Sequence, residues 1–178
     1  PVIDDDGTVV FDSNAILLWL GDKTGKFVPT DTASGARAEM LSWLMFIASG
    51  IGPFSGQAVH FRTAAPEPKE YALNRYDFEA NRHWQIIEDR LATHRYMLGD
   101  EYSIVDMALW GWARMAPFVT ADDQLWTRMP NLKRFMDEVG ARPAVAKVAE
   151  LAKAHTFKTE MDDEAKKAMF PANSRLKS

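Results

Sequence analysis

The spacing of hydrophobic positions changes after about residue 32. Short runs of β-branched and aromatic residues flank Asp5-Asp6-Gly7, which predicts a β-hairpin over residues 1–11. A helix is predicted over residues 13–22, with Asp12 or Ser13 as its cap. Beyond a linker that contains Gly, Pro and Thr, apolar residues recur three and four positions apart, which is typical of amphipathic helices. The pattern predicts a mainly α-helical chain that opens with a ββα unit.

The helical part is expected to begin with one long helix over residues 33–61. Gly50, Gly52 and Pro53 fall inside it and should kink it, because proline removes one backbone hydrogen bond. Further helices are predicted over residues 69–93, 103–118, 131–141 and 144–154. Residues 155–178 are polar and are predicted to form a loosely ordered tail.

The composition is that of an ordinary globular protein. The chain has 178 residues, of which 47% are hydrophobic, and this excludes disordered and collagen-like classes. The balance of 21 basic against 25 acidic residues gives a net charge of −4, without the basic cluster that nucleic acids require. The longest apolar stretches, such as residues 41–49, are too short to span a membrane. Neither nucleic acid nor a membrane is therefore an expected partner.

The chain contains no cysteine. This excludes a disulfide framework, thiolate metal sites and a cysteine nucleophile within these residues. The four histidines do not pair at the spacing of metal ligands, so no metal site is expected.

The start of the first predicted helix carries the most informative chemistry. A helix N-terminus attracts anions, and Ser13 adds a hydroxyl donor there. The carboxylate of Asp12 could hold an ammonium group beside it. One carboxylate and one ammonium on the same carbon describe the end of an α-amino acid. Ahead of this helix, the edge strand at Val2 could present its backbone to an extended peptide.

A second polar motif, Ser103-Ile104-Val105-Asp106, precedes a very apolar stretch. The spacing predicts a capping box between Ser103 and Asp106, in which each side chain accepts a hydrogen bond from the other residue's backbone. This structural interpretation is favoured over a serine nucleophile, because no histidine lies close in sequence. The glycines at 50–56 depart from dinucleotide-binding spacing and are interpreted as a helix kink.

The remaining polar residues of the long helices have mainly structural interpretations. His83 lies on a buried stripe and is expected to be a satisfied core or interface histidine, whereas His60 follows the kink and would face what the kink exposes. Arg75, Glu79 and Arg82 share one helix face. A solvated ion-pair face is favoured there over a guanidinium wall for a carboxylate ligand.

Taken together, these motifs resemble the glutathione transferase family. The resemblance rests on Pro-x-Ile at 1–3, Asp-Ser-Asn-Ala-Ile-Leu-Leu-Trp-Leu at 12–20, and Tyr-Ser-Ile-Val-Asp-Met-Ala at 102–108, which looks like the family's folding box. Gly-Pro-Phe-Ser-Gly-Gln-Ala-Val-His-Phe at 52–61 resembles the bacterial Nu-like branch. The resemblance covers nearly all of residues 1–154.

The resemblance implies a particular domain organisation. Residues 1–24 would be the C-terminal portion of a thioredoxin-like glutathione-binding domain, residues 25–32 a linker, residues 33–154 the all-helical C-terminal domain, and residues 155–178 a polar tail. The first part of the thioredoxin-like domain, which carries the residue that activates the glutathione sulfur, would precede Pro1. No catalytic residue is therefore assigned within this chain.

The resemblance also implies a function and a set of binding residues. The expected protein is a cytoplasmic, homodimeric transferase or disulfide-bond reductase in detoxification, which uses glutathione as co-substrate and takes a small electrophile or disulfide. Val2, Asp12 and Ser13 match its glutathione-binding positions, and Gln57, His60 and Arg75 are candidates for a cleft shared between subunits. The alternative is a non-catalytic interaction module of the same fold, and the Asp12-Ser13 pair favours the enzyme, because such a module would not need a site for the end of an amino acid.

Overall fold

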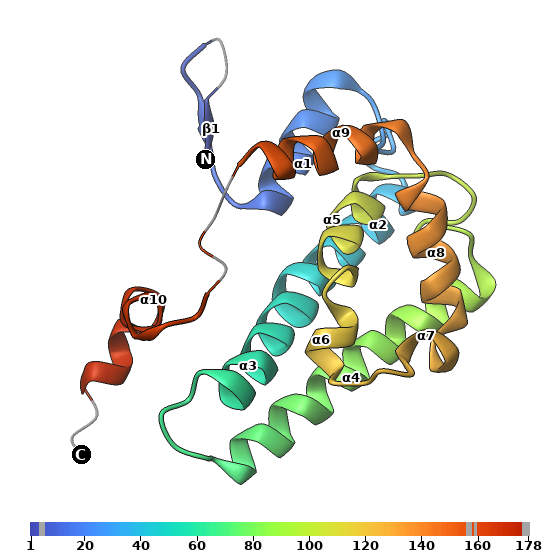
Figure 1. The fold of residues 1–178 in the computed structure, drawn as a ribbon. Coiled ribbons are helices and arrows are strands. Elements are labelled where there is room, and N and C mark those ends of the chain that lie inside the picture. The colour runs from blue at the N-terminus through green and yellow to red at the C-terminus, as the bar shows by residue number, and fades with distance from the viewer. Residues whose placement is uncertain (4–5, 156–157, 159, 176–178) are drawn as a thin grey trace.

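The protein is described here by a computed structural model, which is mainly α-helical with a two-stranded sheet at its start (Figure 1). The structure describes all residues except 4–5, 156–157, 159 and 176–178. The elements are β1 (Val2–Ile3), β2 (Val9–Val10), α1 (Ser13–Thr24), α2 (Gly35–Phe46), the π-helix η1 (Ile47–Ile51), α3 (Gly52–Thr63), α4 (Glu70–Thr93), α5 (Ile104–Ala113), α6 (Ala116–Thr120), α7 (Leu125–Arg128), α8 (Pro130–Gly140), α9 (Pro143–Ala154), α10 (Asp163–Met169) and the 3-10 helix η2 (Pro171–Arg175). The predicted fold class, helices preceded by a ββα unit, is confirmed.

The N-terminal unit lies at one end of the helical bundle. Strands β1 and β2 pair antiparallel, as the hairpin pattern predicts, with Val2 opposite Val10. Of the predicted turn, Asp5 lies outside the described residues. Helix α1 is fixed to α2 by a bidentate ion pair, in which the Arg37 guanidinium donates to the Asp22 carboxylate over 2.6 and 2.9 Å. This pair anchors the C-terminal end of α1 to the start of α2.

The predicted long helix is continuous but changes its winding in the middle. The π-helix η1 joins α2 to α3, and it widens the turn just before Pro53. Gly50 allows the ring of His83 on α4 to come close, since a Cβ at residue 50 would lie 2.6 Å from the His83 Cδ2 atom. The kink predicted from the glycines and proline is therefore a π-helical segment fitted against α4.

Two predictions about helix extent are wrong. Residues 103–118 do not form one helix, because Pro117 starts the separate helix α6, and the Met115 N–H turns back to the Trp112 carbonyl over 2.9 Å. The tail is also more regular than predicted, since α10 and η2 lie within it. Asp162 caps α10 by accepting from the Ala165 N–H over 2.9 Å, which explains why a polar segment is helical.

The hydrophobic core runs through the middle of the bundle, between α2, α4, α5 and α8. Its largest fully buried side chains are Trp84, Phe135, Met40, Leu44, Ile47, Ile51, Ile87, Leu91, Met97, Leu109, Leu125 and Met129. Among the described residues, no helix combines the length and the apolar character that crossing a membrane demands.

Candidate functional site

The N-terminus of α1 is held in an unusual backbone conformation at Asp12. This residue has φ 70° and ψ 130°, in a region that residues other than glycine rarely adopt. The Asp12 Oδ1 atom accepts hydrogen bonds from the N–H groups of Asn14 at 2.9 Å and Ala15 at 3.2 Å. Asp12 is therefore the helix cap, and its own carboxylate occupies two of the N–H groups that were expected to attract an anion. Such strain is found at ligand sites more often than elsewhere.

Ser13 keeps its donors available. It is the first residue of α1, so its N–H has no partner inside the helix, and its side chain is exposed. Within the described part of the chain, neither its N–H nor its hydroxyl takes part in a hydrogen bond. The α1 tip thus offers two adjacent donors at Ser13 and the second carboxylate oxygen of Asp12, which fits a group that carries both signs of charge.

Asn14 is a polar residue at this tip that the sequence interpretation passed over. The residue is only 7% exposed, and its backbone N–H donates to the Asp12 carboxylate. Asn14 lines a groove of about 540 Å³ between β2, α1 and α2, whose other walls include Leu18, Leu44 and Met45. Asn14 therefore places a polar side chain in a groove whose other walls are largely apolar.

The other predicted site residues lie at different distances from the tip. Val2 is in β1 and pairs with β2, next to the strand that lines the groove. Gln57 and His60 are on α3, where Gln57 is exposed and the His60 ring contacts Phe61 and Phe170 at 5.4 and 4.8 Å. None of these three side chains lines the groove at α1.

Arg75 belongs to an ion-pair cluster on α4. The Glu79 carboxylate accepts from Arg75 over 2.9 Å and lies 2.7 Å from Arg82. The hydrogen bond from Arg82 lowers the pKa of Glu79, and Arg75 acts in the same direction. His83 is buried on the same helix, where its Nδ1 atom lies 2.7 Å from the Glu79 carbonyl and its ring stacks on Phe46. The predicted ion pairs are present, although the Glu79 carboxylate is buried rather than solvated, and His83 is the buried, hydrogen-bonded histidine that was predicted. A role of Arg75 in a shared cleft stays a prediction.

The predicted capping box at α5 is present. The Asp106 Oδ2 atom accepts from the Ser103 N–H at 2.8 Å and from its hydroxyl at 2.9 Å. The Asp106 Oδ1 atom also accepts from the Met97 N–H at 2.8 Å, a bond that the local motif does not predict. Burial raises the pKa of Asp106, while these hydrogen bonds act in the opposite direction. Through these hydrogen bonds, Asp106 attaches the start of α5 to the loop that precedes it.

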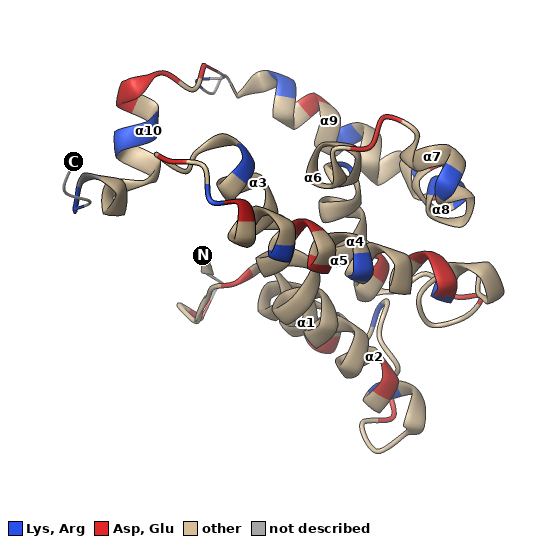
Figure 2. Ribbon diagram, turned by 90° about the horizontal axis from the view of Figure 1, so that it is seen from below, with Lys and Arg blue, Asp and Glu red and all other residues tan. Residues whose placement is uncertain are grey.

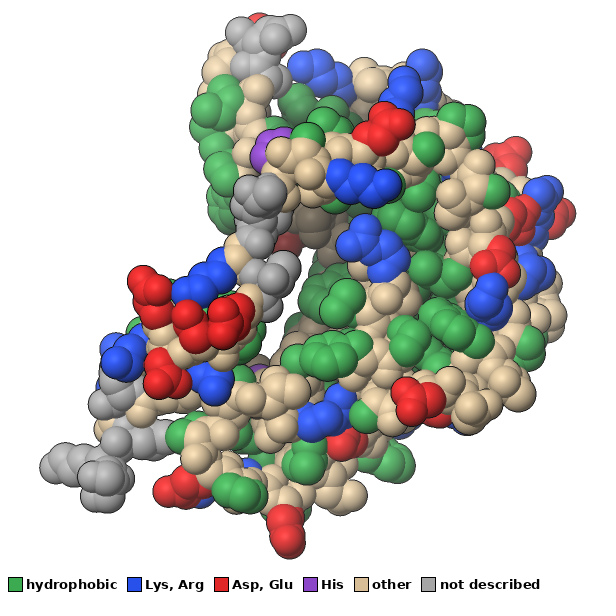
Figure 3. Space-filling model, viewed as in Figure 1, with side chains coloured by type: hydrophobic (Ala, Val, Ile, Leu, Met, Phe, Trp, Pro, Cys, Tyr) green, Lys and Arg blue, Asp and Glu red, His purple; other side chains and the backbone are tan. Residues whose placement is uncertain are grey.

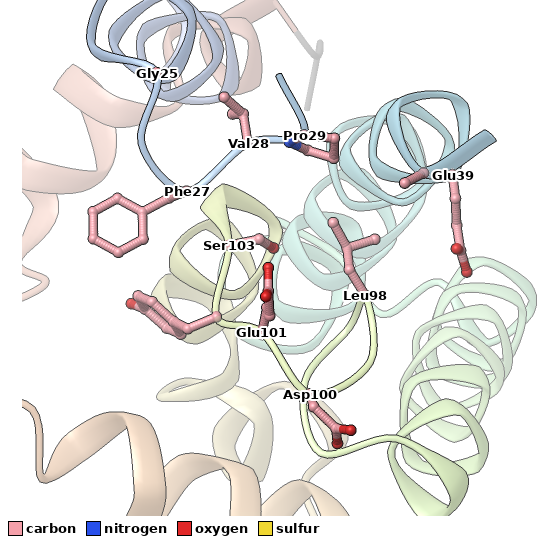
Figure 4. Close-up of a pocket in the computed structure, with 11 residues that line it drawn as sticks. Gly25, Phe27, Val28, Pro29, Glu39, Leu98, Asp100, Glu101 and Ser103 are labelled. Carbon is pink, nitrogen blue, oxygen red and sulfur yellow. The ribbon is translucent and has the colours of Figure 1, made fainter. Parts of the chain in front are cut away.

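A larger cavity, of about 630 Å³, lies on another part of the surface (Figure 4). It is bordered by the connection between α1 and α2 and by the loop that precedes α5. The carboxylates of Glu39, Asp100 and Glu101 line it, and Figure 4 shows them on its rim. Three carboxylates would repel an anionic ligand, so the smaller groove at α1 is the better candidate for one. In the described residues, no cluster of three or more His, Asp or Glu could hold a metal ion.

Comparison with known proteins decides the family. Residues 43–143 match the model of the glutathione S-transferase C-terminal domain. The chain belongs to the glutathione S-transferase family. Among curated relatives, the disulfide-bond oxidoreductase YghU of Escherichia coli (strain K12) is 39% identical over 146 residues, which are 76% of this chain and 48% of that protein. YfcG of the same organism, also a disulfide-bond oxidoreductase, is 36% identical over 76% of this chain and 60% of that protein.

Solved structures of this family have the same arrangement of helices. A glutathione transferase from Burkholderia graminis with two glutathione molecules bound per subunit matches with a TM-score of 0.70 and 35% identity, over 81% of this chain and 62% of that one. The transferase URE2P6 from Phanerochaete chrysosporium, in complex with oxidised glutathione, matches with a TM-score of 0.77 and 30% identity, over 85% and 70%. The chain thus spans about half the length of the curated relatives, and similarity to the bacterial oxidoreductases is consistent with the Nu-like branch.

Proposed function

We propose that this chain belongs to a glutathione-dependent enzyme, either a transferase or a disulfide-bond reductase. The single observation that carries the proposal is the α1 tip, where Ser13 keeps two free donors beside a strained Asp12. Relatives named as disulfide-bond oxidoreductases and solved relatives with bound glutathione support it. The division into residues 1–24, 25–32, 33–154 and 155–178 belongs to the same proposal.

Glutathione would bind through its γ-glutamyl end. The Ser13 N–H and hydroxyl would donate to the α-carboxylate, and the free Oδ2 atom of Asp12 would accept from the ammonium group. The backbone of Val2 would pair with the cysteinyl part in the manner of an added strand. The Asn14 side chain, which lines the same groove, supports a polar guest at this end.

The reductase chemistry would use two glutathione molecules. The first thiolate attacks one sulfur of the substrate disulfide, which breaks the S–S bond, forms a mixed disulfide and releases a thiolate that takes up a proton. The second glutathione thiolate attacks the glutathione sulfur of the mixed disulfide, which yields oxidised glutathione and the second thiol. This chain supplies no thiol of its own, because it contains no cysteine.

We also propose that the protein forms a homodimer through the outer face of α4. Tyr71 and Phe78, which are 85% and 62% exposed, lie about two turns apart on this face. Large apolar side chains grouped on a surface mark association sites. Figure 2 shows acidic and basic positions interleaved along α4, and the flanking Arg75 and Arg82 would be close to the interface. A Phe78→Glu variant should sediment as a monomer, whereas a wild-type protein that is already monomeric would contradict this interface.

A cytoplasmic location stays a prediction.

A turnover assay on the full-length protein tests the proposed function. Hydroxyethyl disulfide and chlorodinitrobenzene are offered separately with reduced glutathione, and oxidised glutathione or the aryl thioether is measured. Glutathione-dependent product with either substrate supports an enzyme, and product from the disulfide assigns the reductase activity. Binding of glutathione without turnover of either substrate would favour the non-catalytic module instead. The Ser42→Ala variant, whose exposed hydroxyl donates only to the Ala38 carbonyl of its own helix, should match wild type.

A further inference from the structure

The cavity between the α1–α2 connection and the loop before α5 takes no part in the proposed glutathione chemistry. Its volume of about 630 Å³ is typical of sites for small molecules. The connection contributes residues 25 and 27–29, α2 contributes residues 36 and 39, and the loop contributes residues 98 and 100–103. We call this space the linker cavity. Figure 4 shows Val28 and Pro29 on one side of it, facing Leu98 and Glu101 on the other.

The walls of the linker cavity are fixed by contacts that do not involve a ligand. The Ile104 N–H donates to the Phe27 carbonyl over 3.0 Å, which joins the two sides. The rings of Phe27 and Tyr102 meet edge to face at 5.8 Å. The guanidinium carbon of Arg142 lies 3.7 Å from the centre of the Tyr102 ring. The cavity is therefore formed in advance, so that a ligand would not have to order it.

Part of the lining is apolar. The side chains concerned are those of Phe27, Val28, Pro29, Ala36, Leu98 and Tyr102. Phe27 is 46% exposed, so its ring presents apolar surface to water at the edge of the cavity. Burial of such surface against a ligand is favourable. The ligand should therefore carry an apolar group.

The charged part of the lining has one sign. The carboxylates are those of Glu39, Asp100 and Glu101, and among the described residues that line the cavity none is Lys, Arg or His. On the face of the bundle that Figure 3 shows, acidic and basic side chains instead lie next to each other. Arg90 forms an ion pair with Glu39, and Arg95, which interacts with the charge of Asp100, is paired with Glu138. The lining therefore favours a positive charge.

An organic cation fits this lining better than a metal ion does. Among the residues that the structure describes, no group of three or more His, Asp or Glu is arranged to hold a metal. We propose that the linker cavity binds a small amine, whose ammonium group faces Asp100 and Glu101 and whose apolar body lies on the apolar part of the lining. The proposal does not depend on glutathione binding at α1.

Ligand-observed NMR titration of the full-length protein tests this site. The probes are phenethylamine, its neutral isostere 2-phenylethanol and the anion 3-phenylpropionate. An amine of this size should bind with a Kd on the order of 1–10 mM. The alcohol should bind about 5- to 20-fold more weakly, and the anion more weakly still, because neither pairs with the carboxylates.

Substitution of the exposed carboxylates locates the amine. Asp100→Asn and Glu101→Gln should each weaken its binding by about 2- to 5-fold and leave the alcohol unaffected. Glu67→Gln is the matched control, since this exposed carboxylate precedes the opposite end of α4, and it should bind the amine as wild type does. Equal affinities for amine and alcohol, or an unchanged amine affinity in the Asp100→Asn/Glu101→Gln double variant, would overturn the proposal.

A competition experiment separates this site from the α1 tip, where Asp12 could also attract an ammonium group. Saturating reduced glutathione should leave the Kd of the amine unchanged. Displacement of the amine by glutathione would assign it to the α1 tip and overturn the linker cavity as its site. A protein that binds no glutathione would refute the proposed function, whereas the titrations of the carboxylate variants would still decide whether the linker cavity binds the amine.

Discussion

Replacement of Gly50 by alanine tests how the kinked helix is fitted against α4. The new Cβ would lie 2.6 Å from the His83 Cδ2 atom and 2.8 Å from its Nε2 atom. Ordinary contact begins at 3.4 Å, so the ring or the helix would have to move by about 0.8 Å. The ring has little freedom, because it lies 5.2 Å from Phe46 and 4.6 Å from Phe54, and its Nδ1 atom is bonded to the Glu79 carbonyl.

The expected cost follows from two destabilising terms and one stabilising term. Overpacking of a tight core costs about 1–3 kcal/mol, and loss of the His83 hydrogen bond adds about 1 kcal/mol. The higher helix propensity of alanine returns about 1 kcal/mol. We therefore expect Gly50→Ala to lower the free energy of unfolding by about 1–3 kcal/mol. In a protein of this size the melting temperature should fall by about 2–4 °C for each kcal/mol.

Urea unfolding followed by tryptophan fluorescence and circular dichroism measures this effect. Gly56→Ala is the matched control on the same helix, because no atom lies within 4 Å of its added Cβ, and it should stabilise the protein by about 0.5–1 kcal/mol. In a His83→Ala background, the penalty of Gly50→Ala should disappear. Equal stabilities of Gly50→Ala and Gly56→Ala would refute the close approach of η1 to His83.

Two further predictions concern the hydrogen bonds of Asp106 and the ion pair between Asp22 and Arg37. Asp106→Ala should lower the free energy of unfolding by about 2–4 kcal/mol, because it leaves donors of Met97 and Ser103 unpaired. Calorimetry should find that its affinity for glutathione is unchanged. A loss of affinity at full stability would contradict the structural role of Asp106. Arg37 holds the pKa of Asp22 below its ordinary value of 3.8, so their bridge stabilises the protein above that pH and is lost as the pH falls through the lower folded pKa. Asp22→Asn should therefore lower the free energy of unfolding by about 1 kcal/mol at pH 7, and by less as the pH of the urea titration is lowered. A stability difference that does not change with pH would show that the Asp22–Arg37 ion pair does not contribute to it.

The sequence predicts local features of this fold better than distant ones. Asp12, Ser103 and Asp106 were predictable because capping depends on residues three positions apart. The bond from Met97 to Asp106 was not, because it joins a loop to a helix start nine positions away. The division between α5 and α6 was missed because the apolar pattern continues through Pro117 and outweighed the proline signal.

The candidate site shows the same limit. The role that we propose for Ser13 follows from its place after a strand and an acidic residue. Asn14 was overlooked, because its place in the groove depends on the walls that β2 and α2 supply. The contact between His60 and Phe170 joins residues 110 positions apart in the chain, and no periodicity predicts it.

Isothermal titration calorimetry of reduced glutathione into the full-length protein tests the central claim most directly. The wild-type protein should bind, and Ser13→Ala should weaken binding by about 1–3 kcal/mol, because a ligand carboxylate loses a donor. Ser42→Ala should bind as wild type does. Identical affinities for wild type and Ser13→Ala, or no binding at all, would show that the tip of α1 does not hold the γ-glutamyl group.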